Sequence, residues 1–352
     1  MSIPTMDGIT AKTITSDRLT TRVLFSGPED GTPVMFVHGN VSCATYWEET
    51  MLALPEGFRG IAADNRGYNE ADRSKKIDAT RGMGDLSDDL AALMDTLGIA
   101  KAHVVGHSLG GSVLWRFMMD YPDRVLTVTQ AAPGSPYGFG GTKGENGEMC
   151  FPDGAGAGGG IVSPDFVKLV QEGYRGDEEQ QGPRNVMNSF YWKPPFKPAR
   201  EEELLSGMLT IHVGEDAWPG DATPSENWPM AAPGKLGPNN GLAPNHVADV
   251  EKLYAIDPKP PVLWIRGAED QIVSDNSFFE MGTLGQAGLV PGWPGEDVFP
   301  PQPMIAQTRA VLETYQARGG SYEELVLEDC AHSPYIEKPA EFNAAFHAHI
   351  QK

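Results

Sequence analysis

Short apolar runs alternate with helical patterns in the first and last thirds of the chain. Apolar runs that end in a loop predict buried strands at 33–37, 60–63, 103–106 and 261–265. Between two of them, Asp85–Leu97 has apolar residues three and four positions apart, which is typical of a helix with one buried face. Strands that alternate with helices predict an α/β fold, with a parallel sheet covered on both faces.

The same patterns extend the predicted sheet and its helices toward both ends of the chain. Loose alternation over Ala11–Phe25 favours one or two strands before a turn at 27–33. The other predicted elements are a helix at 109–121, a strand at 125–131, a helix at 304–318, a strand at 324–327 and a helix at 339–350.

The alternation stops between residues 132 and 256. Nearly half of the 41 glycines and 29 prolines of the chain lie in this segment. Its helical patterns are short, at 165–173, 184–192 and 201–213. We therefore expect residues 1–131 and 257–352 to form one core and residues 132–256 to form an inserted, loop-rich lid. A second stretch rich in glycine and proline, 282–303, predicts a long late loop.

Composition and charge exclude several classes of protein. Hydrophobic residues make up 40% of the 352, with seven tryptophans, which is unlike a disordered chain. The formal net charge of −21 repels phosphate backbones and anionic lipids, so we expect neither a nucleic-acid nor a membrane partner. The sequence leaves the oligomeric state open.

The cysteines and the N-terminus favour a cytoplasmic protein. Cys43, Cys150 and Cys330 are odd in number and widely spaced, which predicts neither a disulfide framework nor a metal site. Met1–Thr15 lacks the basic start and apolar run of a signal peptide, and no run of about 18 apolar residues follows. We expect reduced thiols and an unprocessed cytoplasmic chain.

The clearest chemical motif is Gly106-His107-Ser108-Leu109-Gly110, which follows a predicted buried strand and precedes a helix. A serine in a sharp strand-to-helix turn is held in a strained conformation, and the flanking glycines let neighbouring backbone pass closely. The helix directs its N-terminal amides at an oxyanion formed by serine attack on a carbonyl. Ser108 is therefore the candidate nucleophile.

A serine nucleophile needs a histidine base that is oriented by a carboxylate. Of eight histidines, only His332 follows a late predicted strand of the sheet within a loop. Asp270 follows the strand at 261–265 and is the candidate acid, with Glu269 and Asp275 as weaker alternatives. The end of the preceding strand offers no acid.

With these residues the chain resembles the α/β-hydrolase family, on both sides of the predicted lid. Ser108, Asp270 and His332 come in the family's order of nucleophile, acid and base. The resemblance implies an eight-stranded, mostly parallel sheet and an oxyanion hole made by the amides of Leu109 and Asn40, to which the Asn40 side chain could add a donor. It implies no cofactor and no metal, and a loop-shaping role for His38.

The chain departs from the family in one turn. Many relatives have Gly-x-Gly-x-Ser where this chain reads Gly67-Tyr68-Asn69-Glu70-Ala71. Because asparagine tolerates a positive φ, we expect the turn to survive at Asn69. Epoxide hydrolases and haloalkane dehalogenases of the family attack with an aspartate, and Ser108 disfavours both.

Aromatic residues of the predicted lid are candidates for substrate contact. They can line an adaptable apolar pocket, or they can form a small core for a segment with few regular elements. The segment has no concentrated cationic site for a phosphate or for coenzyme A, which favours a neutral substrate. The candidate substrate-binding residues are His107, Phe190, Tyr191, Trp192 and Trp218.

The sequence thus predicts a serine hydrolase that cleaves a carboxylic ester or lactone of a fairly apolar small molecule. Carbon–carbon bond hydrolases, amidases, aminopeptidases and cofactor-free haloperoxidases share the fold and the triad, and spacing does not separate them. A ligand-binding, receptor-like protein of the same fold is the non-enzymatic alternative.

Overall fold

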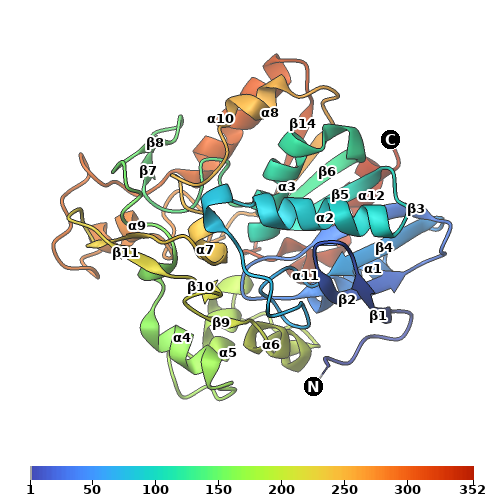
Figure 1. Ribbon diagram of the computed structural model, residues 1–352, viewed down its shortest axis with the longest axis horizontal. Coiled ribbons are helices and arrows are strands. Elements are labelled where there is room, and N and C mark those ends of the chain that lie inside the picture. The colour runs from blue at the N-terminus through green and yellow to red at the C-terminus, as the bar shows by residue number, and fades with distance from the viewer. Residues whose placement is uncertain (1) are drawn as a thin grey trace.

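The computed structural model describes residues 2–352 and is built around one eight-stranded sheet (Figure 1). The strand order is β1-β2-β4-β3-β5-β6-β13-β14. The six strands from β4 to β14 are parallel, whereas β2 pairs antiparallel with both β1 and β4. Their bounds are β1 Thr10–Thr15, β2 Thr20–Ser26, β3 Thr32–Val37, β4 Phe58–Ala63, β5 Ala102–His107, β6 Val125–Ala131, β13 Val262–Gly267 and β14 Tyr322–Leu327. The predicted α/β fold with a mostly parallel sheet is confirmed.

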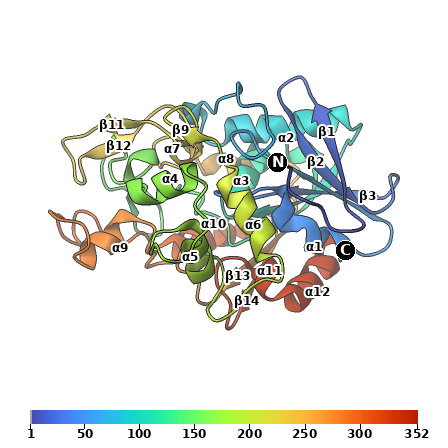
Figure 2. The same ribbon diagram turned by 90° about the horizontal axis from the view of Figure 1, so that it is seen from below.

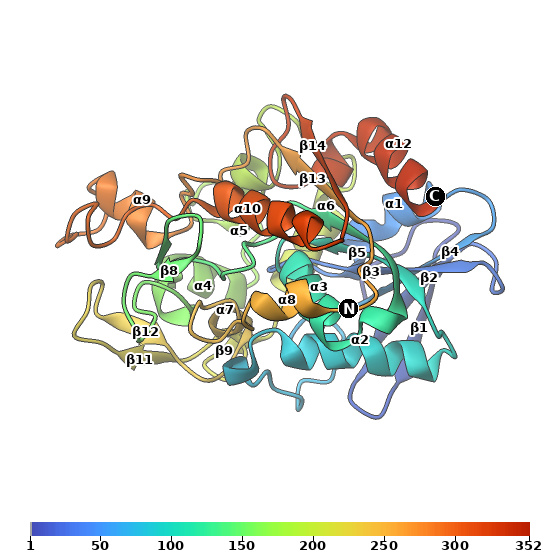
Figure 3. The same cartoon turned by 90° about the horizontal axis from the view of Figure 1, so that it is seen from above.

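Helices cover both faces of this sheet, as Figures 2 and 3 show from opposite sides. Successive side chains of a strand point to opposite faces of the sheet. In β3, Val34 and Phe36 belong to the apolar cluster on one face, and Met35 and Val37 belong to the cluster on the other. The first cluster includes residues of α1 (Glu48–Leu52), α11 (Pro334–Glu337) and α12 (Pro339–Ile350). The second includes residues of α2 (Gly84–Thr96), α3 (Leu109–Asp120), α8 (Glu251–Ala255) and α10 (Met304–Ala317).

Segment 132–256 leaves the sheet after β6 and returns before β13, its neighbour in the sheet. Its helix α6 contacts the 3₁₀ turn Ala44–Trp47 that follows β3, and its last helix, α8, packs against α3 and α10. The elements of the segment before α8 are short, the longest being α6 with nine residues. They are β7 Thr142–Lys143, β8 Glu148–Met149, the 3₁₀ turn Gly159–Ile161, α4 Pro164–Gln171, α5 Pro183–Val186, the π-helical turn Met187–Tyr191, α6 Glu201–Leu209, β9 Val213–Gly214, β10 Trp218–Pro219, β11 Ala222–Pro224, β12 Ala231–Pro233 and α7 Pro238–Gly241.

The late stretch 282–303 corrects one expectation. A long loop is predicted there, but helix α9, Met281–Gln286, occupies its start. The Glu280 side chain caps this helix by accepting hydrogen bonds from the amides of Gly282 and Thr283. Two glycines within six residues lower the intrinsic helix propensity, which is why the pattern conceals the helix. Within residues 2–352, no helix is both long and apolar enough to cross a membrane.

Candidate active site

Ser108 occupies the turn between β5 and α3. Its backbone has φ 54° and ψ −116°, a region that non-glycine residues adopt only under strain. The amide of Ser108 donates to the carbonyl of Ala131 at 3.1 Å, which fixes the turn to the neighbouring strand β6. The Ser108 side chain is half-buried at the carboxyl edge of the parallel strands.

The two flanking glycines are required by close backbone contacts. A Cβ on Gly106 would lie 2.5 Å from the carbonyl oxygen of Gly110. A Cβ on Gly110 would lie 2.2 Å from the carbonyl oxygen of Val37, in the adjacent strand. Both distances are far below van der Waals contact, so the sharp turn depends on glycine at both positions.

His332 and Asp270 form a buried pair. The Nδ1 atom of His332 lies 2.7 Å from Oδ2 of Asp270, and the residues are 2% and 7% exposed. The other oxygen, Oδ1, accepts from the amides of Ile272 at 2.8 Å and Val273 at 3.0 Å. Because the carboxylate accepts, Nδ1 carries the hydrogen, and Nε2 is left to accept a proton.

The alternative acids are engaged elsewhere. Glu269 forms an ion pair with Lys193, with 2.6 Å between Oε1 and Nζ. Asp275 accepts from the amides of Ile305 and Ala306 at the start of α10. Of the three acids considered from the sequence, the structure brings only Asp270 to His332.

Ser108 and His332 are linked through His107. Among residues 2–352, no hydrogen bond joins Oγ of Ser108 to the ring of His332, and such contacts often tighten only when substrate binds. The rings of His107 and His332 lie 4.7 Å apart, centroid to centroid. His107 Nε2 donates to the carbonyl of His332 at 2.9 Å, and the Tyr335 hydroxyl donates to His107 Nδ1 at 3.3 Å.

His107, one of the candidates for substrate contact, is buried and hydrogen-bonded within the protein. The side chain is 2% exposed and both ring nitrogens have protein partners. Burial lowers the pKa of His107 well below 6.5, with the charge of His332 acting in the same direction, so the ring is neutral. His107 joins the nucleophile turn to the base loop.

Two amides are free to form an oxyanion hole. Leu109 begins α3, and the first amides of a helix have no partner within the helix. Within residues 2–352, neither the Leu109 nor the Asn40 amide donates to another group. The loop of Asn40 runs along the nucleophile, because a Cβ on Gly39 would lie 3.1 Å from Cβ of Ser108.

The side chain of Asn40 has other partners. Its Nδ2 donates to Oδ1 of Asn239 at 2.9 Å, and its Oδ1 accepts from the Tyr68 hydroxyl at 2.7 Å. It therefore serves to hold the loop, and the further oxyanion donor considered from the sequence is occupied.

His38 and Asn69 shape the loops behind the site. His38 is fully buried; its Nε2 accepts from the Asn65 amide at 2.9 Å and its Nδ1 donates to the carbonyl of Gly39 at 2.8 Å. Burial lowers the pKa of His38 to about 4. Asn69 has φ 40°, as expected for the altered turn, and donates to Oδ2 of Asp64 at 2.7 Å.

The aromatic candidates for substrate contact divide into two groups. Trp192 and Trp218 are 0% and 1% exposed and belong to an apolar cluster of the core. Phe190 is half-buried and packs edge-to-face on Phe279 at 4.9 Å. Tyr191 is 7% exposed and lies beside His332, with ring centroids 6.3 Å apart.

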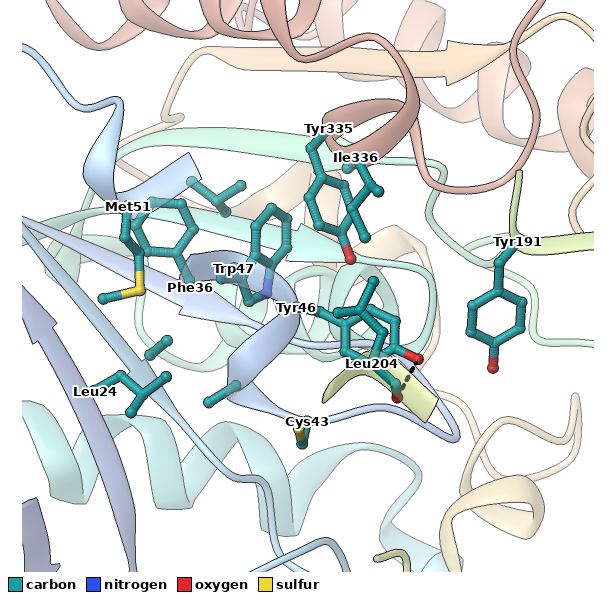
Figure 4. Packing of buried hydrophobic residues seen from close by; sticks show 14 of the residues in the cluster. Leu24, Phe36, Cys43, Tyr46, Trp47, Met51, Tyr191, Leu204, Tyr335 and Ile336 are labelled. Carbon is teal, nitrogen blue, oxygen red and sulfur yellow. Dashed lines mark hydrogen bonds between the residues drawn. The ribbon is translucent and has the colours of Figure 1, made fainter. Parts of the chain in front are cut away.

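Sequence reasoning missed a buried aromatic pair beside His107. Trp47 and Tyr335 stack with ring centroids 4.0 Å apart (Figure 4). Their ring centroids lie 6.5 Å and 5.1 Å from that of His107. Tyr335 lies three residues after His332, a spacing that was available from the sequence. No pattern connects Trp47 to it, because their contact depends on the packing of α1 near α11.

The cysteines and possible metal ligands add no second site. Cys43 and Cys330 are fully buried, and burial raises the pKa of the Cys43 thiol to about 12 and that of Cys330 further. All three cysteines are unpaired. Across residues 2–352, no three side chains of His, Cys, Asp or Glu are grouped to hold a metal ion.

Comparison with known proteins agrees with the fold described above. The model of the alpha/beta hydrolase fold family matches residues 32–278, which carry the nucleophile turn and the acid loop. The chain belongs to this family. The match covers most of the chain and includes all of segment 132–256.

Individual relatives of this α/β hydrolase are more distant. It is 34% identical over 119 residues to the AB hydrolase superfamily protein YfhM of Bacillus subtilis, covering 34% of this chain and 41% of YfhM. It is 27% identical over 201 residues to the uncharacterized carboxylesterase nap of B. subtilis, covering 54% of this chain and 64% of nap. Each alignment therefore spans less than two thirds of the curated relative.

A solved structure shows the same fold over nearly the whole chain. Carboxylesterase CesB (YbfK) from B. subtilis superposes with a TM-score of 0.56 at 17% identity, covering 97% of this chain and 91% of that one. At this identity the similarity establishes the fold of the α/β hydrolase and leaves its substrate open.

Proposed function

We propose that this α/β hydrolase is a serine hydrolase that cleaves carboxylic esters through Ser108, His332 and Asp270. The observation that carries the proposal is the buried 2.7 Å contact between His332 and Asp270, on loops beside the strained turn of Ser108. A neutral imidazole held by a carboxylate is the base that a serine hydroxyl requires.

The proposed reaction has two halves. Ser108 Oγ attacks the ester carbonyl and passes its proton to Nε2 of His332, while the amides of Leu109 and Asn40 hold the oxyanion. The imidazolium, stabilised by Asp270, then protonates the leaving alcohol. Water, activated by His332, attacks the acyl-enzyme and releases the acid.

We propose a neutral, fairly apolar ester or lactone as substrate. The formal net charge of −21 disfavours anionic substrates, and Phe190 and Tyr191 provide aromatic surface near the site. The likeness to a carboxylesterase of B. subtilis supports ester cleavage. In this proposal segment 132–256 acts as a lid that selects the substrate, and the cytoplasmic location stays a prediction.

Hydrolysis of p-nitrophenyl acetate and butyrate tests the function. Wild-type protein and a Ser87→Ala control, altered at a buried serine of α2, should turn over at the same rate. Ser108→Ala should lose at least about 10³-fold in kcat. Equal turnover by wild type and Ser108→Ala would refute the assignment of the nucleophile.

A substrate panel separates the remaining alternatives. Amides, aminoacyl anilides, vinylogous diketones and peroxide with halide represent the amidase, aminopeptidase, carbon–carbon hydrolase and haloperoxidase activities that share the triad. We expect esters or lactones to give the highest kcat/KM. Tight retention of a ligand without turnover would favour the receptor-like alternative.

A further inference from the structure

Two residues of segment 132–256, Tyr191 and Lys193, contact the loops that carry the proposed catalytic groups. We call these two residues and the buried Trp192 between them the strap. The carbonyl of Tyr191 accepts from the amide of Ser333 at 2.8 Å, directly after His332. The Tyr191 hydroxyl is 3.2 Å and 3.3 Å from the carbonyls of Val41 and Asn40, to which it donates. The strap therefore touches both the base loop and the oxyanion loop.

A buried carboxylate joins the strap to the base loop. Glu337 accepts from the amide of Lys193 at 3.0 Å through Oε1 and from the amide of Ala331 at 2.7 Å through Oε2. Glu337 is 8% exposed, and hydrogen bonds to an ionised acceptor are strong where water is excluded. One side chain thus fixes the residue before His332 relative to the strap.

The Lys193 side chain joins the strap to the acid loop as well. Its ammonium lies 2.6 Å from Oε1 of Glu269, next to Asp270, and 2.8 Å from Oδ1 of Asp329, three residues before His332. Both carboxylates are substantially exposed, so these ion pairs are individually weak and screened by salt. Asp329 has φ 52°, a strained conformation that the pairing helps to retain.

The base loop needs such support because of its place in the sheet. It follows β14, the edge strand, which has a neighbour on one side only. A displacement of about 1 Å between base and nucleophile lowers the rate of a reaction about a hundredfold. The loop after β5, in contrast, lies between strands on both sides.

We propose that the strap and Glu337 position His332 for catalysis, so that this part of segment 132–256 is a fixed component of the active site. The inference rests on the proposed function. Trp192 is fully buried and its two neighbours are hydrogen-bonded to three loops, so the strap stays in place when substrate enters. Any opening of segment 132–256 then occurs outside residues 191–193.

Steady-state kinetics of two variants test the positioning role. Glu337→Gln keeps the size of the side chain but places an amide nitrogen against one of the two backbone donors. We expect kcat to fall about tenfold with KM within about twofold of wild type. Unchanged kcat per active site, counted from the burst of p-nitrophenol, would overturn the proposal even if the melting temperature fell.

Lys193→Met removes the ammonium and keeps the backbone contact to Glu337. We expect kcat to fall about threefold at low ionic strength, and the ratio of wild type to variant to approach one near 1 M salt because the ion pairs are screened. Lys193→Arg should restore the wild-type rate. Lys197→Met, an equal change of charge at an exposed lysine of the same segment, is the control and should match wild type at every salt concentration. A salt-independent ratio would contradict the ion-pair role.

A measurement that needs no turnover separates this inference from the proposed function. The Nδ1 proton shared by His332 and Asp270 should give a proton resonance far downfield of the amides, identified by its loss in His332→Gln. If the wild type hydrolyses no ester, the proposed function fails, and this resonance still tests the strap. Its weakening in Glu337→Gln would support the positioning role, and an unchanged resonance would overturn it.

Discussion

The nucleophile and the base of the proposed triad are held in different ways. Ser108 lies in a turn held mainly by backbone contacts, between central strand β5 and the helix α3 that follows it at once. His332 lies after edge strand β14, and its loop is held by side chains: Glu337 from the helix that follows it, and Lys193 and His107 from distant parts of the chain. One half of the site is therefore local in sequence and the other is assembled by tertiary contacts.

This difference explains which changes the two halves should tolerate. The nucleophile turn has no room for a methyl group added at Gly106 or Gly110, so substitutions there should first lower the stability of the fold. The base loop has several separate supports, so single changes there should lower the rate while the fold persists. Three predictions test this division.

The largest effect is expected on the base side, from Asp270→Asn. The amide can offer an N–H to Nδ1 of His332, which favours the tautomer that cannot accept the serine proton. We expect kcat/KM for p-nitrophenyl butyrate to fall about 10³- to 10⁴-fold with the protein still folded. Asp275→Asn, in the same loop region but capping α10, is the control and should stay within about fivefold. A tenfold loss or less in Asp270→Asn would remove Asp270 from the triad.

On the nucleophile side, Gly110→Ala should act on stability. Its Cβ would lie 2.2 Å from the carbonyl of Val37, and backbone on both sides prevents relaxation. We expect the free energy of unfolding in urea to fall by about 3 kcal/mol or more. Gly84→Ala, whose Cβ would meet no atom closer than 3.3 Å, should change it by less than about 1 kcal/mol. Equal stability of the two variants would show that the turn is not fixed as described.

The smallest effect is expected on the pH dependence of stability, from His103 at the other end of β5. Its Nδ1 atom forms a hydrogen bond of 2.8 Å with Oγ1 of Thr127. Burial lowers the pKa of His103 from 6.5 to about 4. At a pH between these two pKa values, His103 binds a proton in the unfolded chain but not in the folded chain. The free energy of unfolding therefore decreases as the pH falls through this range, by up to about 3 kcal/mol in total.

His103→Gln should reduce that slope and leave kcat unchanged, because the residue lies at the edge of the sheet opposite Ser108. Urea unfolding between pH 7 and pH 4 measures the slope. The pKa of His38 is also lowered to about 4, and His38 is still present in the variant. Part of the decrease in the free energy of unfolding with falling pH should therefore remain. If the free energy of unfolding of His103→Gln depended on pH as that of the wild type does, His103 would have the same pKa in the folded and unfolded chains.

The sequence predicted the local half of the site far better than the assembled half. The bounds of the strand before Ser108 and the helix after it follow from apolar periodicity, and helix α12 was expected at the residues where it lies. The acid and base were placed by strand ends, because parallel strands bring their carboxyl ends to one edge.

What could not be predicted depends on contacts between distant segments. Glu337 and Lys193 carry no motif. Glu337 contacts the residue before His332 from the following helix α11, but its bond to Lys193, and the ion pairs of Lys193, exist only after segment 132–256 has packed against this region. The aromatic pattern of segment 132–256 suits a pocket wall and a small core alike, so the sequence leaves both open; Trp192 and Trp218 are buried in an apolar cluster. Composition does not distinguish a pocket wall from a packed interior.

The central claim is that Ser108 is the residue acylated during turnover. The most direct measurement is the intact mass of the protein after reaction with a fluorophosphonate, followed by peptide mapping of the adduct. We expect one adduct per chain, on the peptide that contains Ser108, with ester hydrolysis lost in proportion. An adduct on another residue, or full hydrolytic activity in protein modified at Ser108, would contradict it.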